Sequence, residues 1–171
     1  RNSKNFPSNS HIAPSLLHVS DDGERVFFES VSAPTKKDTT SDFNPLEVQI
    51  WRTNAKQLVP RTKKGYGNPS SIWSVWHPAT DLIQAIESGQ HPHAVLTGDQ
   101  KNALVFNTTD YLPQFKYGEE YVDMYLLDLT SGEKHLAISK QINRIGQTIM
   151  SPTGKYIAYF KEKNWWTYEI A

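Results

Sequence analysis

Residues 148–170 read Thr-Ile-Met-Ser-Pro-Thr-Gly-Lys-Tyr-Ile-Ala-Tyr-Phe-Lys-Glu-Lys-Asn-Trp-Trp-Thr-Tyr-Glu-Ile, and this stretch decides the fold. Aromatic and β-branched residues dominate its apolar runs, which predicts strands separated by tight turns. Pro152 presets φ at the second turn position, and Gly154 supplies a positive φ that a side chain would oppose. The period of two places three side chains of the last strand on one face, namely Trp166, Tyr168 and Ile170. The stretch is a meander that needs a fourth strand.

The same unit occurs twice upstream, in residues 18–28 and 95–106. In each copy a small apolar strand leads into a polar turn with Asp or Gly, followed by a hydrophobic strand. The equivalent turns begin at Ser20, Thr97 and Ser151, so they lie 77 and then 54 residues apart. Propeller blades usually take about 40–50 residues, so the first interval must hold extra chain. The sequence therefore predicts an all-β partial β-propeller of about three four-stranded antiparallel blades with rim insertions.

The predicted propeller fragment spans residues 1–171 as a single unit. Its parts are an arm or the tail of a preceding strand (1–14), a first blade (15–90) with an insertion (32–71), a second blade (91–140) and an incomplete third blade (145–171). Within the insertion we expect an edge strand or embellishment, a helical turn and a basic Gly-rich loop, at residues 46–51, 53–60 and 61–69. Fewer than four blades cannot close a ring. We expect a piece of a larger propeller, or open edges covered by another copy.

Composition excludes several classes of protein. Eighteen basic and eighteen acidic residues give a net charge of +0, which argues against a nucleic-acid footprint. The chain has no Cys, which excludes disulfides and thiolate catalysis. No apolar run approaches the length of a membrane span, and no charged-then-apolar leader is present. The chain begins at Arg1 rather than Met, so we expect an excised fragment.

Three histidines are the candidate metal ligands, His77, His91 and His93. A His-x-His pair on a strand places both rings on one face, but Pro92 separates these two. No carboxylate or further histidine follows at a zinc-like spacing. The pattern favours loop histidines over a metal site, and we expect no cofactor.

Glu119 and Glu120 form an acidic pair beside Tyr117 and Tyr121. Two carboxylates can bind a cationic group such as the free amine of a peptide. The alternative is a solvated turn with two surface charges, which the pattern favours. The five tryptophans could stack on sugars, but in a propeller we expect aromatic side chains to pack between blades.

The run at residues 151–160 resembles the blades of TolB-like and prolyl-oligopeptidase-family propellers. Their hallmark is Ser-Pro-Asp-Gly-Lys followed by an alternating apolar strand, and here Thr153 replaces the usual Asp. Residues 20–28 match with Asp21 in the Pro position, and residues 128–133 resemble the family's Asp-apolar-x-Ser/Thr-Gly-Glu/Lys hairpin. Residues 48–51 look like the Val-x-Ile-Trp strand of bacterial members with an N-terminal propeller. The resemblance covers residues 16–171.

The resemblance implies a propeller that caps a C-terminal α/β-hydrolase domain and filters the peptides reaching a Ser-Asp-His triad. No Gly-x-Ser-x-Gly nucleophile motif lies in this sequence. The pair at 119–120 is outside the Trp-x-Tyr-Glu-Glu context of the dipeptidyl-peptidase amine-binding pair, so that role is not carried over.

We therefore expect a non-catalytic segment of a bacterial, exported serine-peptidase-like protein, periplasmic or extracellular, that gates or positions peptide substrate. Its partners would be the rest of the propeller and a hydrolase domain. The alternative is a TolB-like scaffold that contacts other proteins through its rims. An autonomous enzyme using channel carboxylates is disfavoured, because no paired acids sit at matched strand ends.

Overall fold

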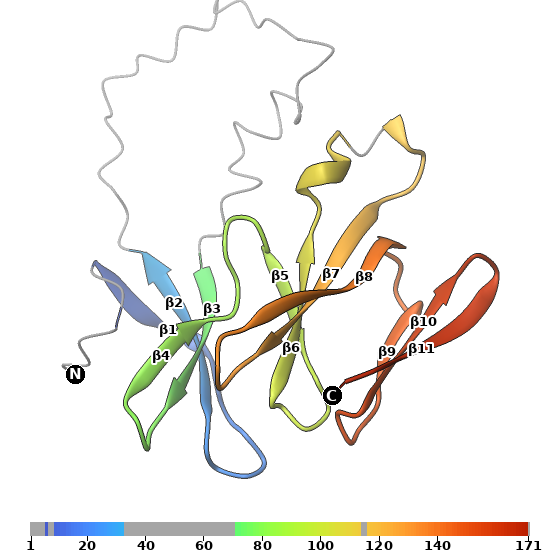
Figure 1. Cartoon of the computed structure of the whole chain (residues 1–171). Helices are drawn as coiled ribbons and strands as arrows, with labels where there is room; N and C mark the ends of the chain where they lie inside the picture. The colour runs from blue at the N-terminus through green and yellow to red at the C-terminus, as the bar shows by residue number, and fades with distance from the viewer. Residues whose placement is uncertain (1–5, 7–8, 33–70, 114–115, 171) are drawn as a thin grey trace, which may run out of the picture.

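The structure is a computed structural model that describes residue 6 and residues 9–32, 71–113 and 116–170. Its strands form three antiparallel sheets (Figure 1). The first sheet, in the order β1-β2-β3-β4, contains β1 (Ser10–Val19), β2 (Val26–Ser32), β3 (Ser71–His77) and β4 (Leu82–Ala85). The second, in the order β5-β6-β7-β8, contains β5 (His93–Leu96), β6 (Asn102–Asn107), β7 (Tyr121–Asp128) and β8 (Lys134–Ile142). The third, in the order β11-β10-β9, contains β9 (Thr148–Met150), β10 (Tyr156–Lys161) and β11 (Asn164–Glu169).

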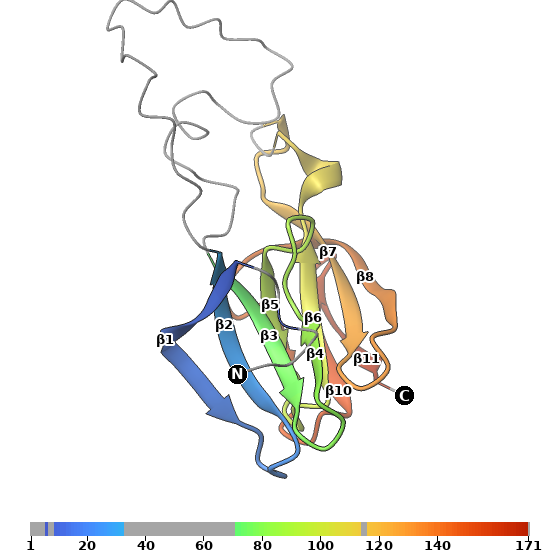
Figure 2. The same cartoon turned by 90° about the vertical axis from the view of Figure 1, so that its left-hand side faces the viewer.

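The sheets lie one behind another and pack face to face, as the two perpendicular views show (Figures 1 and 2). The all-β prediction of successive antiparallel blades is confirmed, with two four-stranded sheets and one three-stranded sheet among the described residues. A short 3-10 helix, η1 (Thr109–Tyr111), lies in the loop before β7. No helix in the described ranges is long and apolar enough to cross a membrane.

The second sheet is buried on both faces, and the alternation of its side chains explains how. Ala103, Val105 and Leu127 join the core with the first sheet, where Phe27 and Val75 are fully buried. The intervening side chains join the core with the third sheet, namely Leu104, Met124 and Leu126 with Ile157. Because successive residues of a strand point to opposite faces, a strand between two cores must be apolar throughout. This accounts for the apolar runs at residues 103–106 of β6 and 124–127 of β7.

The three repeated turns share one hydrogen-bond pattern. The amide of Ser20 donates to the carbonyl of Arg25, and the hydroxyl of Ser20 accepts from the Arg25 amide, each at 2.9 Å. The equivalent hydroxyls accept from Asn102 at 3.1 Å and from Tyr156 at 3.0 Å. The fourth turn residue has a positive φ in all three, at Gly23, Gln100 and Gly154. The sequence repeat is therefore a structural repeat.

The first strand differs from its prediction. Residues 10–14 were expected in an arm or a preceding strand, but β1 already begins at Ser10 and pairs there with Ser32. The register shifts between Ile12 and Leu17, next to Pro14, which has no amide to donate. This irregularity explains why the sequence pattern located only the second half of the strand. The predicted elements at 46–51, 53–60 and 61–69 lie outside the described residues.

Candidate functional site

Two regions of the described chain bring chemically distinctive side chains together. The first is a group of three rings that we call the tyrosine cluster, Tyr111, Tyr117 and Tyr121. Their ring centroids lie 5.8–6.3 Å apart. The cluster comes from η1, the segment after it and the first residue of β7, at the top of Figure 1. The same end of the sheets carries the end of β2 and the start of β3, between which the long insertion runs.

A buried carboxylate fixes the tyrosine cluster in place. The Tyr111 hydroxyl donates to Asp123 Oδ1 at 2.6 Å, and the Lys140 amide donates to the same oxygen at 2.8 Å. Burial, followed by the bond to Asp123, raises the pKa of Tyr111 to about 12. The Lys140 ammonium lies 5.4 Å from the centre of the Tyr121 ring, a cation–π contact. The phenol is thus held as a neutral donor in a fixed position.

The predicted acidic pair lies at the edge of this cluster. Glu119 forms an ion pair of 2.5 Å with the guanidinium of Arg144. Glu120 is exposed, and its backbone carbonyl accepts from the amide of Asn143 at 2.8 Å. Glu119 therefore already has a cation beside it. Both hypotheses for the pair, an amine-binding site and the favoured solvated turn, stay untested.

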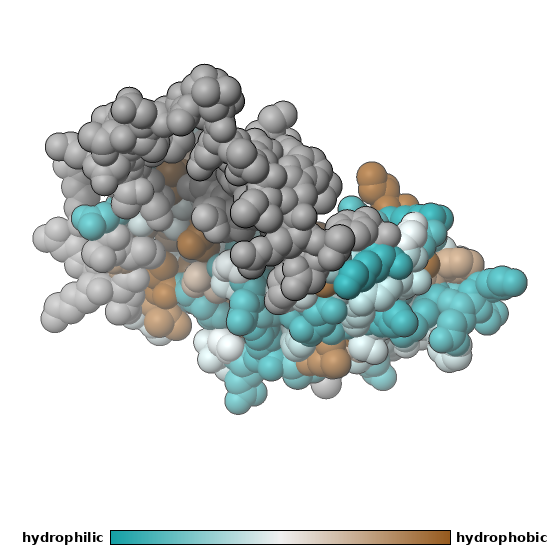
Figure 3. Space-filling model, turned by 90° about the horizontal axis from the view of Figure 1, so that it is seen from above, coloured by the Kyte–Doolittle hydropathy of each residue, from teal (hydrophilic) through white to brown (hydrophobic). Residues whose placement is uncertain are grey.

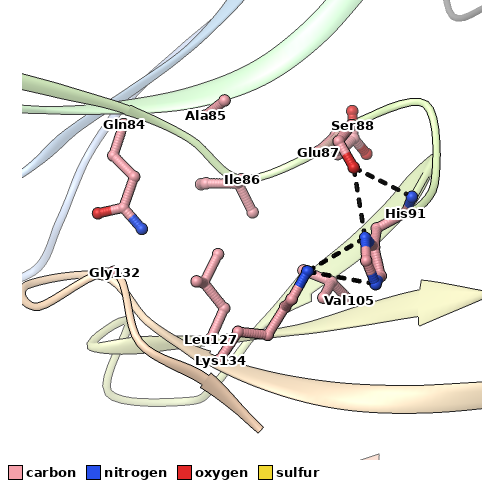
Figure 4. A pocket seen from close by; sticks show the side chains of 10 residues that line it. All are labelled: Gln84, Ala85, Ile86, Glu87, Ser88, His91, Val105, Leu127, Gly132 and Lys134. Atoms are coloured by element: carbon pink, nitrogen blue, oxygen red, sulfur yellow. Dashed lines mark hydrogen bonds between the residues drawn. The ribbon is translucent and has the colours of Figure 1, made fainter. Parts of the chain in front are cut away.

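The second region is a groove of about 300 Å³ between the first and second sheets (Figure 4). We call it the inter-sheet groove. Its apolar lining includes Ile86, Val105 and Leu127, all buried members of the core between these sheets. Gln84 and Lys134 line it from opposite sheets, on β4 and β8. A groove with an apolar floor and a few polar groups at its sides has the general character of a small-ligand site.

His91 stands at one end of the inter-sheet groove. It closes a turn with Ser88, in which each amide donates to the other residue's carbonyl at 2.9 and 3.0 Å. The Lys134 ammonium lies 3.4 Å from its Nδ1 and 3.5 Å from its Nε2, and the Tyr125 ring packs edge-on at 5.3 Å. Burial lowers the pKa of His91, and the charge of Lys134 lowers it further. His91 is therefore held neutral beside a lysine.

Glu87 joins the two sheets behind this groove. Its Oε2 accepts from the amide of Trp73 at 3.1 Å, and its carboxylate also accepts from the backbone of Ala94. Burial raises the pKa of Glu87 above its usual value. The carboxyl group thus serves as a link between β3 and β5.

The three candidate histidines do not converge. His91 is buried in the inter-sheet groove, His93 is exposed on β5, and His77 ends β3. Within the described ranges, no three side chains of the types His, Cys, Asp and Glu come together as a metal site.

Four of the five tryptophans lie in the described residues, and one of them, Trp76, donates from its Nε1 to Asp81 Oδ1 at 3.1 Å. Trp73 packs against Phe27, at 5.9 Å between ring centroids, in the core between the first two sheets, as predicted. Trp165 and Trp166 on the third sheet are 55% and 50% exposed, so the inter-blade packing expected for them is absent among the described residues. Trp51 lies outside the described residues.

Sequence reasoning missed the two pairings that define these regions. Tyr111 and Asp123 are 12 residues apart, and His91 and Lys134 are 43 residues apart. One signal was present, because Asp123 interrupts an apolar strand and a buried carboxylate requires partners. The pairing of Lys134 with His91 depends on how the sheets stack, and no local pattern encodes it.

The stacked antiparallel sheets and their repeated turns define an all-β protein built from propeller-like blades. No protein-family model matches the sequence, and none of the curated proteins matches it. Among solved structures the chain is similar to an oligogalacturonate lyase in complex with manganese, with a TM-score of 0.42 and 11% sequence identity. That similarity covers 100% of this chain and 38% of the lyase chain, so this chain spans well under half of its length.

Proposed function

We propose that this chain is a non-catalytic β-propeller segment that gates or positions peptide for a serine-peptidase domain of the α/β-hydrolase type located elsewhere in the same bacterial, exported protein. The proposal rests on the resemblance of the repeated turns to TolB-like and prolyl-oligopeptidase-family blades. The observation that carries it furthest is the tyrosine cluster, fixed by Asp123 at the end of the sheets from which the insertion leaves.

Rigid tyrosines suit the recognition of peptides. Each ring offers a large apolar surface at a low cost in conformational entropy, and the hydroxyl of an exposed ring such as Tyr117 can bond a peptide carbonyl or amide. Tyr117 is 44% exposed and is braced by contacts with the other two rings. Seen from above, the described part of this end is mainly hydrophilic with scattered apolar patches (Figure 3). Such a mixed surface favours transient contact with a polar chain.

The geometry around His91 supports the non-catalytic part of the proposal. The Ser88 hydroxyl lies 3.3 Å from Nδ1 of His91, a distance at which a serine and a base could act together. However, the same hydroxyl oxygen also accepts from the His91 amide at 3.2 Å, as in an ordinary turn. The adjacent Lys134 makes the imidazole a weaker base. These contacts favour a structural role for Ser88.

The second candidate function is a TolB-like scaffold propeller without an enzymatic domain. The observation in its favour is the outer face of the third sheet, which exposes Ile149, Tyr156 and Trp165. Ile149 pairs with Ala158 and Trp165 with Phe160, so these side chains lie on one face of the sheet. Exposed apolar patches of this kind commonly contact other proteins.

A peptide-binding assay with two matched variants tests the proposal. Tyr117 and Tyr156 are equally exposed, at 44%, but only Tyr117 belongs to the tyrosine cluster. We expect Tyr117→Ala to weaken binding of an immobilised peptide library by about tenfold, as loss of a central aromatic anchor does. Tyr156→Ala should bind like the unmodified chain. The opposite ranking would favour the scaffold, because the third sheet would then be the contact surface.

The same protein can be treated with a fluorophosphonate probe, which labels activated serines. We expect no labelling of this chain. Stoichiometric covalent capture would overturn the non-catalytic proposal, and peptide mapping would then identify the serine.

A further inference from the structure

The inter-sheet groove has an apolar floor that does not depend on a ligand. Ile86, Val105 and Leu127 are 3%, 1% and 5% exposed and belong to the core between the first two sheets. They come from the residue after β4, from β6 and from β7, so the floor spans both sheets. Figure 4 shows Ile86 and Leu127 facing each other across the groove. The volume of about 300 Å³ is at the lower end for ligand sites, so a small molecule fits best.

The Lys134 ammonium supplies a positive charge at the side of this floor. Among the described residues, no carboxylate lies within ion-pair distance of it, and its polar neighbours are the two ring nitrogens of His91. Tyr125 adds a ring face at 5.7 Å. Lys134 is exposed, so a ligand can reach it from solvent. A cation against an apolar wall, without a described counter-ion, is suited to binding an anion.

The other polar groups of the groove include one acid, which is bonded to the backbone, and one amide. Glu87 is the acid among the lining residues, and its carboxylate accepts from the backbone of Trp73 and Ala94. On the opposite side, Gln84 directs its amide toward the groove beside Gly132 (Figure 4). The Gln84 amide has no hydrogen-bond partner in the part of the chain that the structure describes. A free amide N–H group and an ammonium therefore border the same apolar floor.

We propose that the inter-sheet groove binds a small aliphatic carboxylate, with its carboxylate on Lys134 and its branched apolar end over the floor of the groove at Ile86 and Leu127. Gln84 donates a second hydrogen bond from the other sheet. A ligand of this class occurs as a free acid or as the C-terminal residue of a peptide, and both share the chemistry recognised here. The inference is independent of the proposed function, because it uses none of the residues of the tyrosine cluster.

The test is an NMR titration of the isotope-labelled chain with 4-methylpentanoate. We expect saturable shifts at the Gln84 side-chain amide and at the His91 ring. The neutral isostere 4-methylpentanamide should bind about tenfold more weakly or less, because it lacks the charge-assisted bond to Lys134. Equal binding of the acid and the amide would overturn the proposal.

Two variants locate the charge that matters. Lys134→Met keeps an apolar stem of similar length, and we expect it to weaken acid binding by about tenfold or more while leaving the amide unchanged. Lys155→Met removes an exposed lysine from the turn between β9 and β10 and should bind like the unmodified chain. If Lys134→Met bound the acid as well as Lys155→Met does, Lys134 would not be the counter-ion and the proposal would fail. A dispersed amide spectrum of each variant verifies its fold.

A third arm distinguishes the two sources of the ligand. N-acetyl-leucine carries the same branched end and carboxylate as a peptide C-terminus. Tighter binding of N-acetyl-leucine than of 4-methylpentanoate supports the proposal with a peptide terminus as ligand, and the reverse order supports it with a free acid. Absence of saturable shifts with both acids would overturn it.

Discussion

Gly154 lies against the carboxylate of Asp99, so closely that a β-carbon at position 154 would overlap the Asp99 side chain. Asp99 belongs to the turn between β5 and β6, and Gly154 to the equivalent turn between β9 and β10. A β-carbon on Gly98 would likewise overlap the backbone oxygens of Ser151 and Pro152. The repeated turns of adjacent sheets therefore touch, and glycine is needed there for packing between sheets.

The close approach at Gly98 predicts a large effect of a single methyl group. Gly98→Ala would push against backbone atoms, which cannot move without shifting the third sheet, and we expect a loss of about 2–3 kcal/mol in the free energy of unfolding. Urea unfolding followed by circular dichroism measures it. Gly89→Ala is the control, because nothing lies within 4 Å of a β-carbon there. Equal stability of the two variants would show that the turns do not touch.

These turns also show how far the sequence could predict the fold. The positive φ of Gly154 was foreseen from the turn pattern, because turn chemistry is local. The strands were located from period-two apolar runs, which are local as well. The contact of Gly154 with Asp99 joins residues 55 positions apart, and it exists only because the sheets stack in register. Local patterns thus specify the blades, whereas side-chain volumes determine how one blade sits on the next.

The hydroxyl at the first turn position gives a second prediction. Thr97 is 2% exposed, and its Oγ1 donates to Asp99 at 2.7 Å and accepts from the Asn102 amide at 3.1 Å. Thr97→Val keeps the shape but leaves both partners without the hydroxyl, so we expect a loss of about 1–3 kcal/mol in the free energy of unfolding. Thermal and urea unfolding measure it. Thr167→Val on exposed β11 should change stability by less than about 0.5 kcal/mol. A neutral Thr97→Val would mean that the turn does not need its hydroxyl.

Removal of the Tyr111 hydroxyl gives a third prediction. In Tyr111→Phe the Asp123 carboxylate keeps the hydrogen bond from the Lys140 amide but loses the one from the phenol. We therefore expect a loss of about 1–2 kcal/mol in the free energy of unfolding at neutral pH. Tyr156→Phe, at an exposed position on β10, is the control and should be neutral. A neutral Tyr111→Phe would remove Asp123 as the support of the tyrosine cluster.

Alkaline pH provides an independent check of the same bond. The folded pKa of Tyr111 is raised to about 12 from the ordinary 10.0, so the folded state keeps the proton over that window. The stability contributed by Tyr111 is complete below pH 10 and is lost as the pH rises toward 12. Ultraviolet absorbance of the phenolate follows the titration. A Tyr111 that ionised near 10 would contradict the buried bond to Asp123.

The candidate sites were harder to predict from the sequence than the fold. Glu119 and Glu120 are adjacent, so the sequence revealed them, but the Arg144 that pairs with Glu119 follows 25 residues later. His91 was recognised as a possible ligand because histidine binds metals. Its actual neighbour, Lys134, comes from β8 and follows it by 43 residues. A single sequence indicates which residues are reactive, but not which charged residues from distant parts of the chain will lie next to them.

The contact of His91 with Lys134 predicts how the stability of the fold depends on acidic pH. Burial lowers the folded pKa of His91 below the ordinary 6.5, and the charge of Lys134 lowers it further. Unfolding therefore takes up a proton when the pH falls below 6.5. The stability from neutral His91 is thus complete above pH 6.5 and is lost as the pH decreases. Glu87 acts in the opposite sense, because its raised pKa favours the folded state below 4.5 and loses this effect as the pH rises. The Tyr125 ring packs edge-on against the imidazole.

A pair of variants separates these effects. His91→Gln should flatten the loss of stability as the pH falls below 6.5, measured by urea unfolding at each pH, because no imidazole remains to be protonated. In Lys134→Met, titration of the His91 ring carbon by NMR should give a pKa higher than in the unmodified chain and still below 6.5, since burial remains. His135→Gln is the control, because that ring is exposed and contacts the Tyr168 hydroxyl on the third sheet. An unchanged His91 pKa in Lys134→Met would show that the two side chains do not face each other in solution, and the groove would then lack the charge on which its anion binding depends.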